Sequence, residues 1–341
     1  MSYTVALNFE DGVSRFIECN DGETVLDAAY RHKVNLPMDC SDGVCGTCKC
    51  HCHQGEFELG DEYIDEALSD EEAAEGMVLT CQMVPSSDCV VQVPVASSLC
   101  KTGVDRRQAT ITRIEQLSED SIEVEIDIEG EGFSFLPGQY VHLEVPGKGA
   151  HRSYSFSSRP GSSRASFLIR NVPGGLMSGY LTSQAKPGDQ LAVTGPMGSF
   201  YLREITRPVL MLAGGTGLAP FLSMLEQLAE TGCEMPLHLI YGVNRDDHLV
   251  KTAALDAFAE RLPTFSYTTV VVDEASDHPR KGYVTQHMDA EVMHGGDVDV
   301  YLCGPPPMVD AVLKHFDAQG IKPQSFHYEK FTPNQASEEA A

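Results

Sequence analysis

The sequence predicts a multidomain chain of α+β and α/β structure: a compact α+β domain, an antiparallel β-barrel and a parallel-sheet α/β domain, in that order. Three observations support this prediction. The 341 residues suffice for two or three domains with separate cores. Nine of the eleven cysteines fall within residues 1–100. The hydrophobic pattern also changes twice along the chain, near residue 101 and near residue 207.

The first domain is expected over residues 1–100. Residues 3–19 alternate apolar and polar side chains around Asp11-Gly12, which is typical of a β-hairpin. A helical pattern follows at 23–33, and a cysteine-rich loop at 39–53. An acidic stretch at 61–77 is helical or turn-like, and two strand-like segments follow at 78–85 and 89–95.

The second domain is expected over residues 101–206, after a polar linker at 97–108. Several short strand-like segments separated by Gly, Pro and Ser are typical of a small antiparallel barrel. The segments lie at 108–130, 138–145, 151–158, 165–172 and 189–198.

The third domain is expected over residues 207–333, and residues 334–341 are expected to be a disordered tail. Residues 208–230 read as an apolar strand, a glycine turn and a helix. Further apolar runs occur at 237–244, 265–274 and 298–305. Buried strands alternating with helices indicate a parallel sheet covered on both faces.

Charge and composition limit the class of partner. The net charge of −26 argues against nucleic acid, because phosphate binding needs Lys and Arg. No apolar run is long enough to cross a bilayer. The first residues lack the basic start and apolar core of a secretory signal. We therefore expect a cytoplasmic protein that does not partner with membranes.

The cysteine loop has the spacing of an iron–sulfur site. Three cysteines follow the pattern C-x4-C-x2-C, and a fourth comes after thirty-two intervening residues. This is the plant-type ligand spacing for a 2Fe–2S cluster. Gly43 and Gly46 allow the loop backbone to approach the sulfides closely. The expected ligands are Cys40, Cys45, Cys48 and Cys81.

Zinc and disulfides are the competing interpretations of these cysteines. Cys45-x2-Cys48 is a zinc-like pair, and Cys50, His51, Cys52 and His53 are further possible ligands. The second C-x2-C or H-x3-H pair of a usual zinc site is missing. Disulfides are disfavoured in the cytoplasm. We expect Cys50 and Cys52 to be buried as small hydrophobic residues.

The barrel segment contains residues suited to a flavin. Arg152 can pair with a pyrophosphate through its planar fork, and Tyr154 can stack on an isoalloxazine ring. Gly174 and Gly175 precede a helix whose free N–H groups suit phosphate, and Ser178 can add a hydroxyl. Taken alone, the same residues are compatible with an ordinary strand and an ordinary helix cap.

The third domain contains residues suited to a nucleotide. The turn Gly214-Gly215-Thr216-Gly217 departs from the full dinucleotide fingerprint, because a proline stands where the third glycine would be. Proline is compatible with the first turn of the helix, whose N-terminus suits a phosphate. Cys303-Gly304-Pro305 ends a later buried strand, where ligands bind in open α/β sheets. Taken alone, Cys303 also reads as a small buried residue.

The residues after the strand at 237–244 bear on the choice of nucleotide. Asp246 or Asp247 could accept hydrogen bonds from ribose hydroxyls and repel a 2′-phosphate, which favours NADH. Arg245 could do the opposite.

Motifs along nearly the whole chain resemble a known family. Residues 1–100 resemble a plant-type ferredoxin domain, which implies a β-grasp-like fold. Residues 137–331 resemble the ferredoxin–NADP reductase superfamily through "PGQY", "RSYSFSS", "VPGGLMSGYL", "GGTGLAPF", "CGPPPM" and "EKF". This domain order resembles the reductase components of ring-hydroxylating dioxygenases of the benzoate, toluate and anthranilate type.

The resemblance implies cofactors and site residues. It implies that Ser155 lies near the flavin nitrogen that accepts hydride, that Cys303 lies beside the nicotinamide, and that Phe331 lies against the flavin; Tyr154 completes this catalytic set. FAD would be bound by Arg152, Ser153, Tyr154, Ser155, Gly174, Gly175, Met177 and Ser178. NADH would be bound by Gly214, Gly215, Thr216, Gly217, Asp246, Cys303, Gly304 and Pro305.

The function implied by the resemblance is electron transfer from NADH through FAD and the 2Fe–2S cluster to a terminal Rieske-type oxygenase in aromatic catabolism. One alternative is the same machinery serving another oxygenase, such as a diiron aromatic monooxygenase. A second is a zinc-containing nucleotide-binding interaction protein. The sequence does not encode the aromatic substrate, because the partner's active site selects it.

The ligand assignment predicts which thiols the cluster needs. Cys50→Ser and Cys52→Ser should each leave two irons per chain, whereas Cys81→Ser should lose iron, because only the latter removes an expected ligand. Iron content and the visible spectrum measure this. Iron lost from either serine variant but kept by Cys81→Ser would show that the assignment is wrong.

Overall fold

The computed structural model describes residues 2–38, 43, 46–60, 63–65, 67–100, 105–130, 133–161, 164–198 and 200–331. It forms two compact units. The first is Met1–Asp105 with Met197–Ser199, and the second is Arg106–Pro196 with Phe200–Ala341. The expected ligands Cys40 and Cys45 and the expected disordered tail lie outside the described residues.

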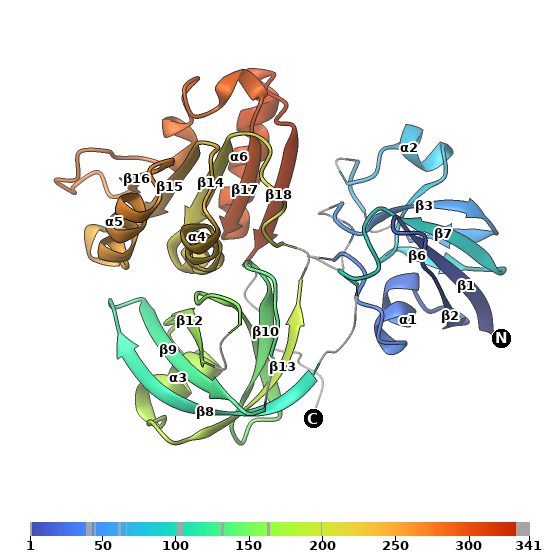
Figure 1. Ribbon diagram of the computed structural model, residues 1–341, viewed down its shortest axis with the longest axis horizontal. Helices are drawn as coiled ribbons and strands as arrows, with labels where there is room; N and C mark the ends of the chain where they lie inside the picture. Colours follow the sequence, from blue (N-terminus) through green and yellow to red (C-terminus); the bar gives the residue numbers. More distant parts are fainter. Residues whose placement is uncertain are drawn as a thin grey trace. The chain divides into compact units, whose positions relative to one another are not determined.

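The first unit is an α+β domain built on a five-stranded sheet of order β2-β1-β7-β3-β5 (Figure 1). The β1–β7 pair is parallel, whereas β1–β2, β3–β7 and β3–β5 are antiparallel. A separate pair of strands is formed by β4 and β6. The elements are β1 Ser2–Phe9, β2 Ser14–Asn20, α1 Val25–Arg31, β3 Lys49–Gln54, β4 Phe57–Leu59, α2 Asp70–Ala74, β5 Met77–Leu79, β6 Met83–Pro85 and β7 Cys89–Val93.

Local chemistry accounts for the boundaries in this unit. The β1–β2 hairpin turns at Gly12, whose φ of 76° suits glycine. Thr24 caps α1 by accepting a hydrogen bond from the Asp27 amide. Ser69 and Glu72 form a capping box at α2. The segment 78–85, expected as one strand, is instead split into β5 and β6, because a turn closes with the Gln82 amide bonded to the Leu79 carbonyl.

The second unit begins with a six-stranded antiparallel barrel of order β11-β10-β13-β8-β9-β12. An isolated bridge between Phe156 and Phe167 links the ends of this order. Its interior is filled by aromatic and aliphatic side chains, with the Phe135 and Phe156 rings stacked 3.6 Å apart. The elements are β8 Asp105–Gln116, β9 Ser121–Ile128, β10 Tyr140–Val145, β11 Ala150–Ser155, β12 Arg164–Arg170, α3 Leu176–Ser183 and β13 Gln190–Met197.

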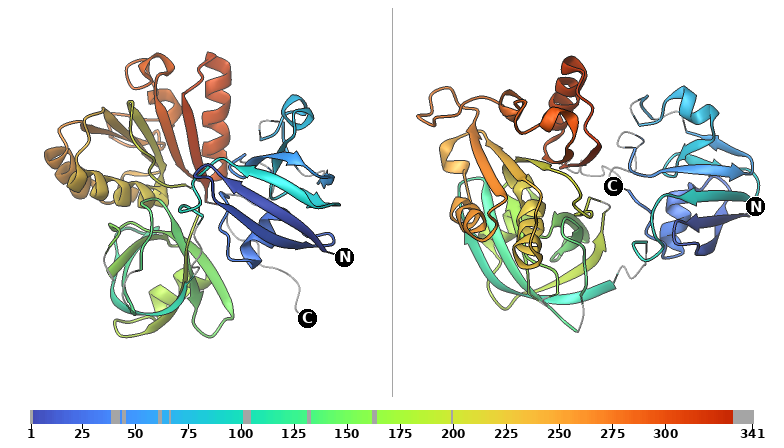
Figure 2. Two further views of the ribbon diagram at one scale, coloured as in Figure 1. Left: turned by 45° about the vertical axis from the view of Figure 1, so that its right-hand side comes forward. Right: turned by 45° about the horizontal axis from the view of Figure 1, so that its top comes forward.

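The rest of this unit is an α/β layer with a parallel sheet of order β16-β15-β14-β17-β18. Helices α4 and α5 cover one face and α6 the other (Figure 2). The strand order reverses at β14, so a crevice is expected at the carboxyl ends of β14 and β17. The main elements are β14 Val209–Gly214, η1 Gly215–Leu218, α4 Ala219–Thr231, β15 Leu237–Val243, η2 Asp246–His248, α5 Thr252–Arg261, β16 Phe265–Val271, β17 Asp299–Gly304, α6 Pro306–Gln319 and β18 Ser325–Lys330.

The barrel and the α/β layer share a hydrophobic core. Leu168 and Phe200 from the barrel side pack in one buried cluster with Phe221, Tyr301 and other side chains of the α/β layer. The shared core holds the end of β11 against the crevice side of the sheet. Among the described residues, no helix is both long and apolar enough to cross a membrane.

Candidate active site and cofactor sites

Close backbone contacts bring the glycine turn against the end of β17. A side chain on Gly217 would collide with the Cys303 carbonyl oxygen, and one on Gly214 would meet the Met308 sulfur. Gly215 has a φ of 56°, which also favours glycine. The turn leads into α4 with a proline in its first turn. The N-terminus of α4 therefore lies beside the crevice, where a nucleotide phosphate would bind.

A buried carboxylate joins the barrel to the sheet at the crevice. Glu329 of β18 accepts a hydrogen bond from the Ser155 hydroxyl at 3.0 Å. The Cys303 sulfur lies 3.7 Å from the same carboxylate oxygen. All three residues are buried, at 3%, 0% and 7% exposure for Ser155, Cys303 and Glu329. Ser155 and Glu329 are 174 residues apart, yet they meet at one point.

Glu329 was missed by the sequence analysis. The only signal was the stretch "EKF", from which Phe331 alone was chosen as a site residue. The parallel register of β17 and β18 pairs Cys303 with Glu329. The Phe331 amide donates to the Gly304 carbonyl at 2.9 Å, which holds Phe331 beside the end of β17. A buried acid that bonds two expected site residues is a group able to position them or hold a proton.

The strand β11 divides its predicted site residues between two faces. Tyr154 packs against the barrel core, and burial raises the pKa of its hydroxyl above its usual value. Ser153 lies on the opposite face and bonds His142 at 3.0 Å. Arg152 shares the face of Tyr154, where its guanidinium donates to the His151 carbonyl at 2.7 Å. Ser153 therefore lies apart from Arg152 and Tyr154.

The loop before α3 is held by its own residues. Gly174 has a φ of 72°, and Gly175 is the N-cap of α3. The Ser178 hydroxyl donates to the Val172 carbonyl at 2.9 Å and accepts from the Val172 amide at 3.2 Å. The Met177 side chain lies in the barrel core. No side chain caps the N-terminus of α3, so its first amides remain suited to a phosphate.

The residues after β15 are engaged in ion pairs and hydrogen bonds. Asp246 accepts from the Ser276 hydroxyl at 2.8 Å. Arg245 is bonded to Asp247 at 3.0 Å. Asp246 and Asp247 thus lie at the carboxyl edge of the sheet, with Arg245 already paired to a carboxylate.

Two of the four cysteines expected to bind the cluster are described, and they lie close together. The sulfurs of Cys48 and Cys81 lie 3.3 Å apart, and both residues are buried. A disulfide would need about 2.05 Å. Two thiolates on one tetrahedral metal with bonds of about 2.3 Å would lie roughly 3.8 Å apart. The pair therefore fits two ligands of one metal centre, and Cys40 and Cys45 lie outside the described residues.

Strand β3 separates the residues that the zinc interpretation needs. Cys50 and Cys52 are buried on one side of β3, whereas His51 and His53 lie on the more exposed side. Burial raises the pKa of the Cys50 thiol far above its usual value, so it remains a protonated thiol. These four residues do not form one metal site.

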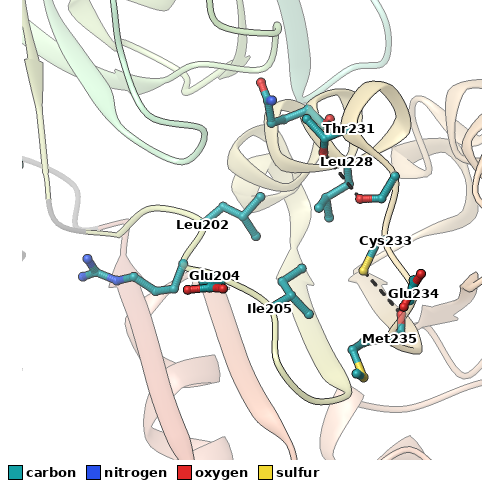
Figure 3. Close-up of a pocket in the computed structure, with 11 residues that line it drawn as sticks. Leu202, Glu204, Ile205, Leu228, Thr231, Cys233, Glu234 and Met235 are labelled. Atoms are coloured by element: carbon teal, nitrogen blue, oxygen red, sulfur yellow. Dashed lines mark hydrogen bonds between the residues drawn. The ribbon is translucent and has the colours of Figure 1, made fainter.

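A pocket of about 400 Å³ lies elsewhere in the second unit. Leu202 and Ile205 face Leu228, Thr231 and Cys233 across it (Figure 3). It adjoins the C-terminal end of α4, whereas the glycine turn is at the N-terminal end. None of the predicted site residues lines it.

Comparison with known proteins defines the class. Three family models match in succession: "2Fe-2S iron-sulfur cluster binding domain" over residues 8–86, "Oxidoreductase FAD-binding domain" over 108–201 and "Oxidoreductase NAD-binding domain" over 211–314. The chain therefore carries sites for a 2Fe–2S cluster, FAD and a nicotinamide dinucleotide, and it is an oxidoreductase. The prediction of these cofactors is confirmed.

The relatives define the family more narrowly. The chain is 57% identical to the toluate 1,2-dioxygenase electron transfer component of Pseudomonas putida, over 97% of this chain and 99% of that protein. It is 50% identical to the 2-halobenzoate 1,2-dioxygenase electron transfer component of Burkholderia cepacia, over 98% and 99%. The crystal structure of the Amycolatopsis cytochrome P450 reductase GcoB matches with a TM-score of 0.74 and 32% identity, over 97% and 99%. The chain belongs to the family of oxygenase electron transfer components.

The buried carboxylate predicts a measurable loss of hydride transfer. Glu329→Ala removes the carboxylate that bonds the Ser155 hydroxyl and lies beside the Cys303 thiol, and it should shift both groups. A misplacement of about 1 Å costs roughly 100-fold in rate. We expect NADH:ferricyanide activity to fall by about that factor, mainly in kcat, with iron and FAD contents unchanged.

The matched control is Asp310→Asn, which removes an exposed carboxylate that pairs with Lys330 at the end of β18. It should retain the activity of the unmodified protein. Equal activity of Glu329→Ala and Asp310→Asn would contradict a role for Glu329.

Proposed function

We propose that this protein is the NADH-dependent reductase of an aromatic-ring-hydroxylating dioxygenase of the benzoate, toluate or anthranilate type, and that its partner is a terminal Rieske-type oxygenase. The observation that carries the proposal is 57% identity with a toluate 1,2-dioxygenase component across all three domains. The identity to the propane 2-monooxygenase reductase component of Rhodococcus jostii is lower, at 34%, so a dioxygenase partner is favoured over a diiron monooxygenase. The match of the 2Fe-2S family model over residues 8–86 disfavours a zinc protein.

Residues of the barrel bind FAD, and residues of the α/β layer bind NADH. Arg152, Tyr154 and the N-terminus of α3 hold FAD, whose phosphates need positive charge and free amides. The glycine turn Gly214–Gly217 and the N-terminus of α4 hold the phosphates of NADH. Ser155 and Glu329 border the place where the two ring systems meet, with Cys303 and Phe331 from the sheet side.

The chemistry supplied by the bound cofactors is hydride acceptance by FAD and one-electron relay by the cluster. The protein residues would place these groups relative to one another. The sulfurs of Cys48 and Cys81 would hold one side of the cluster, with Cys40 and Cys45 as the remaining ligands. Cys50, with its raised pKa, stays a buried thiol.

The choice of NADH and a cytoplasmic location complete the proposal. Asp246 and Asp247 place negative charge at the carboxyl edge of the sheet, where a 2′-phosphate would otherwise lie. Among the described cysteines no disulfide occurs, which is compatible with a reducing compartment.

Reconstitution tests the proposed partner. The loaded reductase should be mixed with purified terminal oxygenases for benzoate, toluate, 2-halobenzoate or anthranilate and, separately, with the hydroxylase of a diiron monooxygenase. We expect NADH-dependent product formation with at least one of the four dioxygenases. The measurement is product formed per NADH consumed, because uncoupled oxidation consumes NADH without product.

Product formation with the diiron hydroxylase and with none of the four oxygenases would refute the proposed partner. Oxidation of NADPH in preference to NADH would refute the proposed nucleotide, whichever oxygenase is served.

A further inference from the structure

Arg245 is bound by two carboxylates from different parts of the second unit. Its Nε and Nη2 atoms bond Asp247 at 3.1 Å and 3.0 Å. Its Nη2 also bonds Glu119 at 2.5 Å. Asp247 belongs to η2 of the α/β layer, whereas Glu119 lies in the turn between β8 and β9 of the barrel. The bond to Glu119, ahead of that to Asp247, raises the pKa of Arg245.

The turn that carries Glu119 is held in place. Asn171 donates from its side chain to the Glu119 carbonyl at 3.0 Å and from its amide to the Asp120 carbonyl at 2.7 Å. Asp120 accepts from the Ser118 hydroxyl at 2.8 Å. An Asp120 oxygen also lies 3.2 Å from the His248 ring. Glu119 and Asp120 are therefore presented to the loop after β15 by a constrained turn.

The position of Arg245 suggests that its ion pair with Glu119 affects the choice between NADH and NADPH. In dinucleotide-binding sheets, the residues after the second strand meet the adenosine ribose. An arginine there binds a 2′-phosphate through its planar fork. Here the fork is already occupied by carboxylates. A 2′-phosphate would have to displace one of them and would lie close to the negative charge of Glu119, Asp120, Asp246 and Asp247.

We propose that Glu119 of the flavin-binding barrel is a specificity-determining residue for the nicotinamide nucleotide: it occupies Arg245 and thereby disfavours NADPH. The inference rests on the proposed function as an NADH-dependent reductase, and it extends the specificity determinant beyond the α/β layer. Glu119 acts through Arg245, so it is a positioning residue for that guanidinium.

Coulomb's law sets the expected size of the effect. One carboxylate about 6 Å from a doubly charged phosphate at high dielectric changes binding by roughly tenfold. Screening at physiological salt reduces this to about threefold. The Glu119 side chain is 75% exposed, so its replacement leaves the core intact.

The experiment compares Glu119→Gln, Glu119→Asp and Glu226→Gln in the full-length protein loaded with FAD and cluster. Glu226 is the matched control, because its carboxylate also pairs with an arginine, Arg261, on the surface of the α/β layer. Titration calorimetry measures binding of 2′,5′-ADP and of 5′-AMP. Steady-state kinetics measure kcat/KM for NADPH and NADH.

We expect Glu119→Gln to bind 2′,5′-ADP about threefold to tenfold more tightly, with its affinity for 5′-AMP unchanged. The ratio of kcat/KM for NADPH to that for NADH should rise, mainly through a lower KM for NADPH. The gain should shrink at high salt. Glu119→Asp should show a smaller gain, and Glu226→Gln none. Equal changes in affinity for 2′,5′-ADP and 5′-AMP in Glu119→Gln would overturn the inference. The same gain in 2′,5′-ADP affinity in Glu226→Gln would also overturn it.

The two proposals fail in different ways. An unmodified protein that prefers NADPH refutes the proposed nucleotide. A protein that prefers NADH, but whose 2′,5′-ADP affinity is unaffected by Glu119→Gln, refutes only the role of Glu119.

Discussion

The Glu329 carboxylate is the contact on which the arrangement of the candidate site depends. Burying a charged group is unfavourable unless hydrogen bonds compensate for lost water. Glu329 accepts from Ser155 at the end of β11 and lies next to Cys303 at the end of β17. These bonds add to the hydrophobic core that the two layers share and hold the end of β11 beside the ends of β17 and β18.

Glycine contacts supply the second constraint, because they decide how near the phosphate turn lies to Cys303. A side chain at Gly217 would collide with the backbone of Cys303, so only glycine allows this approach, whereas one at Gly214 would first meet the flexible side chain of Met308. The glycine turn before α4 therefore lies against Cys303, the neighbour of Glu329. The turn expected to bind the nucleotide phosphates and the residues expected to border the nicotinamide are thus joined by backbone contacts. The pocket at the other end of α4 takes no part in this arrangement.

Much of this organisation could be predicted from sequence because its signals are local. The cysteine spacing, the glycine turn and the alternation of strands are all read within a few tens of residues. The contacts of Glu329 and Glu119 could not be predicted, because they join residues 174 and 126 positions apart and exist only after packing. The turn between β5 and β6 was missed for a different reason. The apolar pattern of 78–85 continues through it, and a backbone hydrogen bond from Gln82 breaks the strand.

The central claim is that the second unit oxidises NADH and that the first unit is needed to deliver electrons to the oxygenase. A chain beginning at Arg106 tests it directly, because it keeps the second unit and removes the cluster domain. We expect this chain to bind FAD, to reduce ferricyanide with NADH at close to the full-length rate, and to support no product formation by the partner oxygenase. Product formation at the full-length rate by the shortened chain would show that electrons reach the oxygenase without the cluster domain.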